Sequence, residues 1–251
     1  MAQLKELARK LGFRAIESNW SEYANAPWLE ELLTAEEKER EKRSLERRIK
    51  EAEIGQFKPM SQFNWSWPKE IDREQVEDLF SLSFLEEKAN IVLVGTNGLG
   101  KTMIAQNLAY RALMTGHKTR LIKASKMLGD LLDCNSAASR KRLLRKFCKT
   151  ELLVIDEVGY MNYDDRYADL LYEVISERYL QYSTIVTTNA VFTDWGKMFP
   201  NAACVVTLVD RLTHKAELVV IDGESYRGHE AQERAEAKAK ARKAKNPKKK
   251  S

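Results

Sequence analysis

A chain of 251 residues, 31 % charged and 43 % hydrophobic, is long enough for one medium-sized domain with a smaller attachment, and its composition excludes a disordered protein. No apolar stretch approaches the roughly 18 residues that cross a bilayer, so no membrane association is expected. The net charge of +5 is unevenly spread: residues 231–251 hold nine Lys or Arg and two Glu, which leaves −2 for the other 230 residues. Any attraction to nucleic acid must therefore come from local basic patches or from this tail.

Three widely spaced cysteines, Cys134, Cys148 and Cys204, favour reduced thiols over a disulfide framework or a zinc site. The first residues lack the apolar core of a signal peptide. We therefore expect a cytoplasmic protein.

Residues 1–55 are expected to form a small all-helical domain. Leu4, Leu7 and Leu11 recur at helical spacing, and a capping-box sequence at 34–37 predicts a helix over about 35–54. In that helix Arg and Glu alternate around a thin apolar stripe, which is typical of a solvated face; contact with DNA or with a partner protein is the alternative.

Residues 56–89 are expected to be a linker followed by a lead-in helix near 71–80. The first part lacks periodicity and is bounded by two prolines. The alternation of Phe63, Trp65 and Trp67 favours an edge strand or an extended segment that lies against the next domain. One of these rings could cover an adenine, or all three could simply pack.

From residue 90 to 228, apolar runs of strand length alternate with helical stretches, which predicts an α/β fold with helices on both faces of a parallel sheet. Ligands of such sheets bind at the carboxyl ends of the strands. The basic tail, 229–251, is expected to begin as a helix and either aids solubility or attracts phosphates. The expected strands are 90–95, 119–124, 152–156, 184–188 and 218–221; the expected helices are 101–115, about 125–132, 138–149, 164–181 and 209–214.

An octapeptide between the first expected strand and helix of this region matches the phosphate-loop pattern G-x-x-x-x-G-K-[ST] at every fixed position. In this setting, backbone N–H groups and a helix N-terminus face a polyphosphate, the lysine adds a charge near the β- and γ-phosphates, and the threonine can hold Mg²⁺. A chance glycine-rich turn is the alternative. The loop consists of Gly95, Thr96, Asn97, Gly98, Leu99, Gly100, Lys101 and Thr102.

Two acidic residues lie at the end of the third expected strand, 152–156. Four apolar residues place Asp156 at the strand's carboxyl end, where it can hold Mg²⁺, and Glu157 can polarise a water for attack on the γ-phosphate. A helix cap is the alternative use of two adjacent acids.

Two further candidates lie downstream. Asn189 ends the fourth expected strand and could orient the attacking water, although an ordinary turn asparagine would look the same. Arg211 could stabilise charge on the transferred phosphoryl group, in its own subunit or in a neighbour's; a surface ion pair is the alternative.

The segment 138–150 has six basic residues and no acid. On a helix, its leucines and its phenylalanine would share one face and its cations would point outward. We expect phosphate contacts without sequence specificity, and a merely solvated face is the alternative. The candidate DNA-binding residues are Lys126, Arg140, Lys141, Arg142, Arg145 and Lys149.

Together these motifs resemble the IstB/DnaC branch of the AAA+ ATPases. The resemblance covers about residues 1–228, and the helical N-terminus and the segment 63–79 are more similar to the IstB transposition helpers than to the DnaC-type helicase loaders. It rests on the phosphate loop, Ile155-Asp156-Glu157, Thr187-Thr188-Asn189, Asp210-Arg211-Leu212-Thr213-His214 and Gly223-Glu224-Ser225-Tyr226-Arg227.

This resemblance implies an AAA+ P-loop core with a five-stranded parallel sheet, binding of ATP and Mg²⁺, ATP-dependent homo-oligomers on duplex DNA, and cooperation with a transposase. It implies that the region 128–149 faces DNA. Too little chain follows Arg211 for a full helical lid, so the lid should be reduced or absent and no second-sensor arginine is assigned. By motif position, the Walker residues would be Lys101, Thr102, Asp156 and Glu157, the first sensor Asn189, and the finger that reaches the neighbouring subunit Arg211.

Two other functions remain open from the sequence. A DnaC-type loader of a replicative helicase would use residues 1–55 as its docking module. A small-molecule P-loop kinase would need an acceptor pocket and a lid, neither of which the sequence shows.

Overall fold

The computed structural model describes residues 1–160, 165–199 and 203–245, and the chain divides into two compact units, Met1–Glu51 and the part from Ala52 onward. Within the described residues, no helix combines the length and the apolarity needed to cross a membrane.

The first unit is all-helical, with α1 (Ala2–Lys10), α2 (Arg14–Ser18), α3 (Trp20–Tyr23) and α4 (Leu29–Ala52). Its small core joins two residues near the end of α1 to Leu29 and Leu33 at the start of α4. The predicted start of this long helix near residue 35 is wrong, because burial of these leucines stabilises turns ahead of the capping-box sequence.

The second unit is built on a five-stranded parallel sheet with strand order β2-β3-β4-β1-β5. The prediction of an α/β fold with a parallel five-stranded sheet is confirmed, with strand bounds within two residues of those expected. The strands are β1 (Asn90–Gly95), β2 (Thr119–Lys123), β3 (Leu152–Val158), β4 (Ser183–Thr188) and β5 (Ala216–Ile221).

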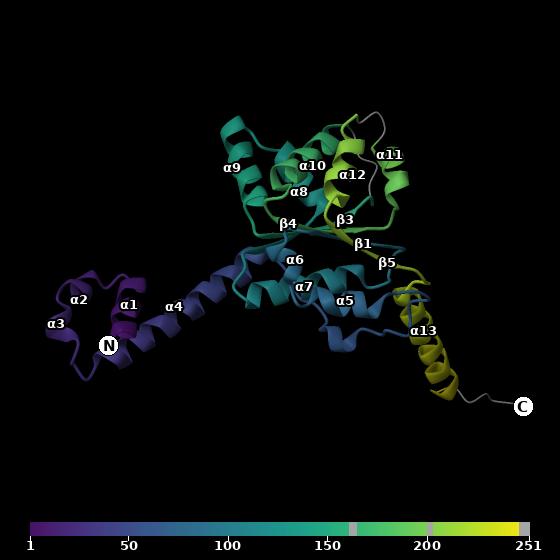
Figure 1. Ribbon diagram of the computed structural model, residues 1–251. Helices are drawn as coiled ribbons and strands as arrows, with labels where there is room; N and C mark the ends of the chain where they lie inside the picture. The colour runs from purple at the N-terminus through teal and green to yellow at the C-terminus, as the bar shows by residue number, and fades with distance from the viewer. Residues whose placement is uncertain (161–164, 200–202, 246–251) are drawn as a thin grey trace, which may run out of the picture. The chain divides into compact units, whose positions relative to one another are not determined.

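Helices cover both faces of this sheet (Figure 1). One face carries α5 (Arg73–Leu79), α6 (Ser83–Glu86) and α7 (Lys101–Met114), and the last helix, α13 (Tyr226–Lys245), follows β5. The lead-in helix is thus α5, slightly shorter than predicted. The other face carries α8 (Ala124–Leu132), α9 (Ala137–Cys148), α10 (Asp165–Arg178), α11 (Trp195–Met198) and α12 (Val205–Thr213).

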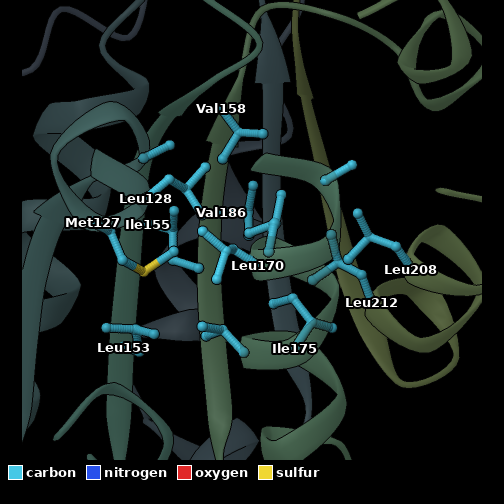
Figure 2. Close-up of a cluster of buried hydrophobic side chains, with 14 of the residues drawn as sticks. Met127, Leu128, Leu153, Ile155, Val158, Leu170, Ile175, Val186, Leu208 and Leu212 are labelled. Atoms are coloured by element: carbon cyan, nitrogen blue, oxygen red, sulfur yellow. The ribbon is translucent and has the colours of Figure 1, made fainter. Parts of the chain in front are cut away.

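The main core lies between the sheet and this second layer (Figure 2). Ile155 of β3 and Val186 of β4 are buried against Leu170 of α10 and Met127 of α8, while Leu208 brings in α12. Because strands buried on both faces need apolar residues on both, the short apolar runs of the sequence located the sheet reliably.

The segment 56–68 does not form the edge strand that the alternating aromatic residues suggested. It contains a single short 3₁₀ turn, η1 (Met60–Gln62), and lies along α7. There Asn107 accepts a hydrogen bond from the Met60 N–H at 3.1 Å and donates to the Lys58 carbonyl at 2.9 Å. Side-chain amides of a helix thus satisfy backbone groups that a neighbouring strand would otherwise pair.

Arg178, at the end of α10, is 1 % exposed and joins α9 to the sheet. Its guanidinium donates to the Phe147 carbonyl and to the Thr150 carbonyl, both at 2.7 Å, and to the Thr184 hydroxyl at 2.9 Å. Burial lowers its pKa to about 9. Because these acceptors include carbonyls at the end of α9, Arg178 closes that helix in the way that a capping residue would.

Substitution of Arg178 with Met should lower the free energy of unfolding by about 3 kcal/mol or more, because several buried acceptors lose their donor at once. Urea denaturation followed by circular dichroism would measure this. The matched control is Arg111→Met, at an exposed position of α7, where the change should stay below about 0.5 kcal/mol. Equal effects of the two substitutions would contradict the role of Arg178.

Candidate active site

The phosphate loop joins the carboxyl end of β1 to the first residue of α7, as the sequence predicted. Gly98 and Gly100 have φ values of +82° and +90°, which residues with a Cβ rarely adopt. Neighbouring side chains also occupy the space that a Cβ would need, Ser225 at Gly98 and the Phe63 ring at Gly100. The glycines are therefore required both by the backbone path and by what packs on it.

Lys101 is 5 % exposed, and its ammonium group is held by the loop itself. Nζ donates to the Gly95 carbonyl at 2.6 Å and to the Thr96 carbonyl at 2.7 Å. Burial lowers the Lys101 pKa to about 8, with a smaller contribution in the same direction from Arg227 and an opposing one from Asp156. Because burial disfavours the charged form of Lys101, an anion that enters the loop would stabilise its ammonium group.

Asp156, 2 % exposed at the end of β3, lies between two hydroxyl groups. Its Oδ1 accepts from the Thr102 hydroxyl at 2.9 Å and from the Thr187 hydroxyl. Mg²⁺ typically takes only a few oxygen ligands from a protein, and phosphate and water fill its other coordination positions. A threonine hydroxyl and a carboxylate are protein ligands of this kind. Thr102 and Asp156 therefore fit the predicted magnesium site.

Thr187 is a site residue that the sequence analysis did not assign. It comes from β4, which lies between β1 and β3 in the sheet, and its Oγ1 also accepts from the Glu157 N–H at 2.9 Å. One hydroxyl therefore fixes both acidic residues. Its position in a Thr-Thr-Asn strand end was the only available signal.

Glu157 has a left-handed φ of +62° and lies within an irregularity in the pairing of β3 with β4, between Ile155 and Val158. Such a conformation costs a non-glycine residue about 1 kcal/mol or more and turns its side chain away from the regular strand direction. The carboxylate meets Lys123 Nζ, at the end of β2, at 2.7 Å. This ion pair raises the Lys123 pKa and holds the carboxylate at the edge of the sheet where Lys101 lies.

Asn189 follows β4 directly and is exposed. A Cβ on Gly159, in the turn after β3, would come within 3.2 Å of its amide oxygen. The structure thus places Asn189 at the same sheet edge as the two acids, next to the segment that follows them.

Arg211 lies at the opposite edge of the sheet from the phosphate loop. The Leu212 carbonyl accepts from the side chain of Asn90, the first residue of β1, at 3.0 Å, whereas the loop begins at Gly95, the last residue of that strand. At about 3.3 Å per residue the two ends are about 17 Å apart. The guanidinium lies over the ring of Tyr172, in α10, and over the ring of Tyr179, which follows that helix. Arg211 therefore does not reach the phosphate loop of its own chain.

A cavity of about 620 Å³ opens beside the phosphate loop. The segment 56–68 forms one wall, and the first turn of α13 forms another. The Trp67 ring contacts the rings of Tyr226 and His229, with centroids 5.4 and 4.4 Å apart, and its Nε1 donates to the Glu224 carbonyl at 2.7 Å. This cavity combines aromatic walls with a phosphate loop, as a nucleotide requires.

Arg227 lines the same cavity, although the sequence analysis gave it no role and assigned no second-sensor arginine. Its only signal was its place in the Gly223–Arg227 sequence that carried part of the resemblance.

The basic helix α9 forms close to its predicted bounds, with Phe147 buried. Two of the six candidate DNA-binding residues are already paired: Arg140 with Glu173 at 3.0 Å and Lys126 with Glu53 at 3.5 Å. The other four are exposed and form no ion pair with a described residue: Lys141, Arg142, Arg145 and Lys149.

A family described as IstB-like ATP binding proteins matches residues 1–235. The chain belongs to this family. It is 31 % identical over 234 residues to an insertion sequence IS5376 putative ATP-binding protein of Geobacillus stearothermophilus, covering 90 % of this chain and 93 % of that one. It is 32 % identical over 188 residues to an insertion sequence IS21 putative ATP-binding protein of Pseudomonas aeruginosa, covering 75 % and 71 %. The resemblance drawn from the motifs is thereby confirmed.

Solved structures share the fold. DnaI aligns with a TM-score of 0.56 at 15 % identity, covering 67 % of this chain and 93 % of that one. The DnaC helicase loader aligns with a TM-score of 0.51 at 18 % identity, covering 68 % and 97 %. This IstB-like protein therefore has the AAA+ P-loop fold, as predicted.

The Lys101 pKa predicts how ATP affinity depends on pH. Below pH 8 the ammonium group is already charged; above it, binding must take up a proton, because phosphate favours the charged form. Affinity should thus fall by about tenfold per pH unit above 8. Calorimetry in buffers of different ionisation enthalpy should find about one proton taken up at pH 9 and almost none at pH 7.

The matched control is Lys101→Arg, because a guanidinium stays charged over this range. Any binding that remains should show no proton uptake from this position at pH 9. Equal uptake by the control and the natural chain would show that another group titrates.

Proposed function

We propose that this IstB-like protein is a Mg²⁺-dependent ATPase of the cytoplasm that assembles on duplex DNA when ATP is bound and assists a transposase. The observation that carries the proposal is the position of Arg211, about 17 Å along β1 from its own phosphate loop. If the arginine serves the reaction, it serves a second copy of the chain.

The names of the relatives support the proposed cooperation with a transposase. Both relatives described above are insertion-sequence ATP-binding proteins, so a transposase encoded with them is the natural partner. The exposed cations of α9 are the best candidates for contacts with DNA phosphates, which position a protein on a duplex without reading its sequence.

In the proposed reaction, each residue has one task. Lys101 and the loop N–H groups bind the phosphates, and Thr102 and Asp156 would hold Mg²⁺, whose charge would stabilise the negative charge that develops on the phosphates. Glu157 accepts a proton from water as the water oxygen bonds to the terminal phosphorus and the bond to the bridging oxygen breaks, releasing ADP. Asn189 orients the water, and Arg211 of a neighbouring copy stabilises the transition state.

The cavity suggests where the nucleoside binds. Residues 56–68 lie over the loop, and the Phe63 ring contacts Gly100 from the cavity side. We assign the base to the space between this segment and Tyr226, where aromatic walls exclude water.

Arg211→Ala should keep ATP binding and lower turnover by about 10³-fold or more, because the finger acts on the transition state. Glu157→Gln should also bind ATP and not hydrolyse it. Mixing the two inactive variants on duplex DNA should restore turnover, since the Glu157→Gln chain supplies an intact Arg211 to a site with an intact Glu157. Phosphate release would measure this. Persistent inactivity of a mixture that still co-assembles would contradict action between chains.

A separate experiment tests whether the exposed cations of α9 bind DNA. Reversing three unpaired charges of α9, Lys141→Glu, Arg142→Glu and Arg145→Glu, should weaken binding of the ATP-loaded protein to every duplex sequence. The slope of log affinity against log salt should flatten by about 0.9 for each lost phosphate contact, as fluorescence anisotropy would show.

The matched control reverses three cations of α4, at Lys38, Lys42 and Arg47. It should leave the salt slope unchanged. A normal slope in the α9 variant, with a flattened one in the control, would assign DNA contact to the first unit. Preference for single strands with capture of a replicative helicase would instead support a loader function.

A further inference from the structure

Arg211, in the last turn of α12, has its guanidinium over two aromatic rings. Its Cζ lies 5.1 Å from the ring centroid of Tyr172 and 5.8 Å from that of Tyr179. At both distances an aromatic face attracts a guanidinium. Tyr172 lies in α10 and Tyr179 directly follows it, and α10 packs beside α12 (Figure 1). The direction of the Arg211 side chain is therefore set by the neighbouring helix.

The end of α12 is fixed on both sides of this contact. The Leu212 carbonyl accepts a hydrogen bond from the buried side chain of Asn90 at 3.0 Å, which attaches the backbone next to Arg211 to the sheet. The Tyr179 hydroxyl forms a hydrogen bond with Nδ1 of His214, the residue that ends α12, at 3.0 Å. The backbone that carries the arginine and one of the rings that hold it are thus tied to each other.

The guanidinium nevertheless keeps its N–H donors free. Arg211 forms no ion pair and no side-chain hydrogen bond with any residue that the structure describes, so the surface ion pair that was the alternative for it is not found there. Aromatic rings attract the flat face of a guanidinium, whereas phosphate oxygens bind the five N–H donors at its edges. Rings can therefore orient this side chain without occupying the groups that a phosphate needs.

We propose that Tyr172 and Tyr179 are positioning residues that hold Arg211 in the orientation in which it meets the nucleotide of a neighbouring copy. A free arginine side chain samples many rotamers, and ordering it during the reaction costs free energy. The two rings order it beforehand, on a helix end that is itself fixed. The inference rests on the proposed function, because it takes Arg211 to act between chains.

A mixture of two inactive chains separates the arginine from the site that it serves. The finger chain carries Glu157→Gln, so it supplies Arg211 and does not hydrolyse ATP itself. The site chain carries Arg211→Ala, so it hydrolyses ATP only with the arginine of a finger chain. Turnover of this mixture on duplex DNA with Mg²⁺ and ATP, measured by phosphate release, reports the contact between the two chains alone.

Loss of the rings from the finger chain should slow the mixture. Tyr172→Leu or Tyr179→Leu in that chain should lower turnover by about threefold, and both together by about tenfold or more, because each ring adds a modest attraction. Tyr172→Phe keeps the ring and should change turnover by less than about twofold. Sedimentation with DNA should show the same co-assembly in every mixture.

The matched control places the same two leucines in the site chain. Position 211 of that chain is already alanine, so the rings have no guanidinium to hold and turnover should not change. Equal losses from both placements would show that the tyrosines only stabilise the fold, and would overturn the inference. Unchanged turnover with the substituted finger chain would also overturn it. So would faster turnover, because the rings would then hold Arg211 away from the neighbouring site.

Failure of the proposed function would look different. If the mixture without leucines co-assembles and stays inactive, Arg211 does not act between chains and the proposed function falls. The hold of the rings has its own readout, because phenylglyoxal reacts with accessible guanidinium groups. It should modify Arg211 about threefold faster in the Tyr172→Leu chain than in the natural chain, as mass spectrometry of the peptide would show. An unchanged rate would overturn the inference whatever the turnover of the mixture.

Discussion

The hydroxyl of Thr187 is the contact on which the site depends. It donates to Asp156 and accepts from the Glu157 N–H, so that β4 fixes both acids of β3. The same Asp156 oxygen accepts from Thr102 in the first turn of α7, which joins the acids to the phosphate loop. Three elements far apart in the sequence are thus connected by three hydrogen bonds, and the two that end on the Asp156 carboxylate are strengthened by its charge. Mg²⁺ would bind beside Thr102 and Asp156, at the end of this series of hydrogen bonds.

Parallel sheet topology makes this arrangement possible. All five strands end at one edge, so the loop after β1, the acids after β3 and Asn189 after β4 meet there. The same topology sends α12 back across the sheet, so Arg211 near its end lies at the other edge. If Arg211 acts on the terminal phosphate, only the Arg211 of a neighbouring copy can reach it. Hydrolysis and assembly would then be coupled by geometry alone.

Much of this was predictable from the sequence because the signals are local. The phosphate loop has fixed positions within eight residues, and the buried strands are continuous apolar runs. The fold class could therefore be predicted, and Lys101, Thr102, Asp156 and Glu157 could be named as candidates for the site. The start of α4 could not, because Leu29 and Leu33 act through packing on α1 and override the local capping signal. The wall formed by 56–68 depends on amides of α7 and has no local pattern of its own. The pairing of Glu157 with Lys123 and the approach of Arg227 to the loop join segments dozens of residues apart, and single-sequence periodicity does not record them.

The central claim is that one nucleotide is bound by two chains, and a crosslink tests it most directly. A photoreactive benzoylphenylalanine at position 211, introduced into isotopically heavy chains and mixed with light chains, can be activated in the presence of ATP and duplex DNA. Mass spectrometry should then find heavy-to-light crosslinks between residue 211 and peptides that contain the phosphate loop or Asn189. Crosslinks confined to single chains, or the absence of any between chains while both ligands are bound, would contradict the account.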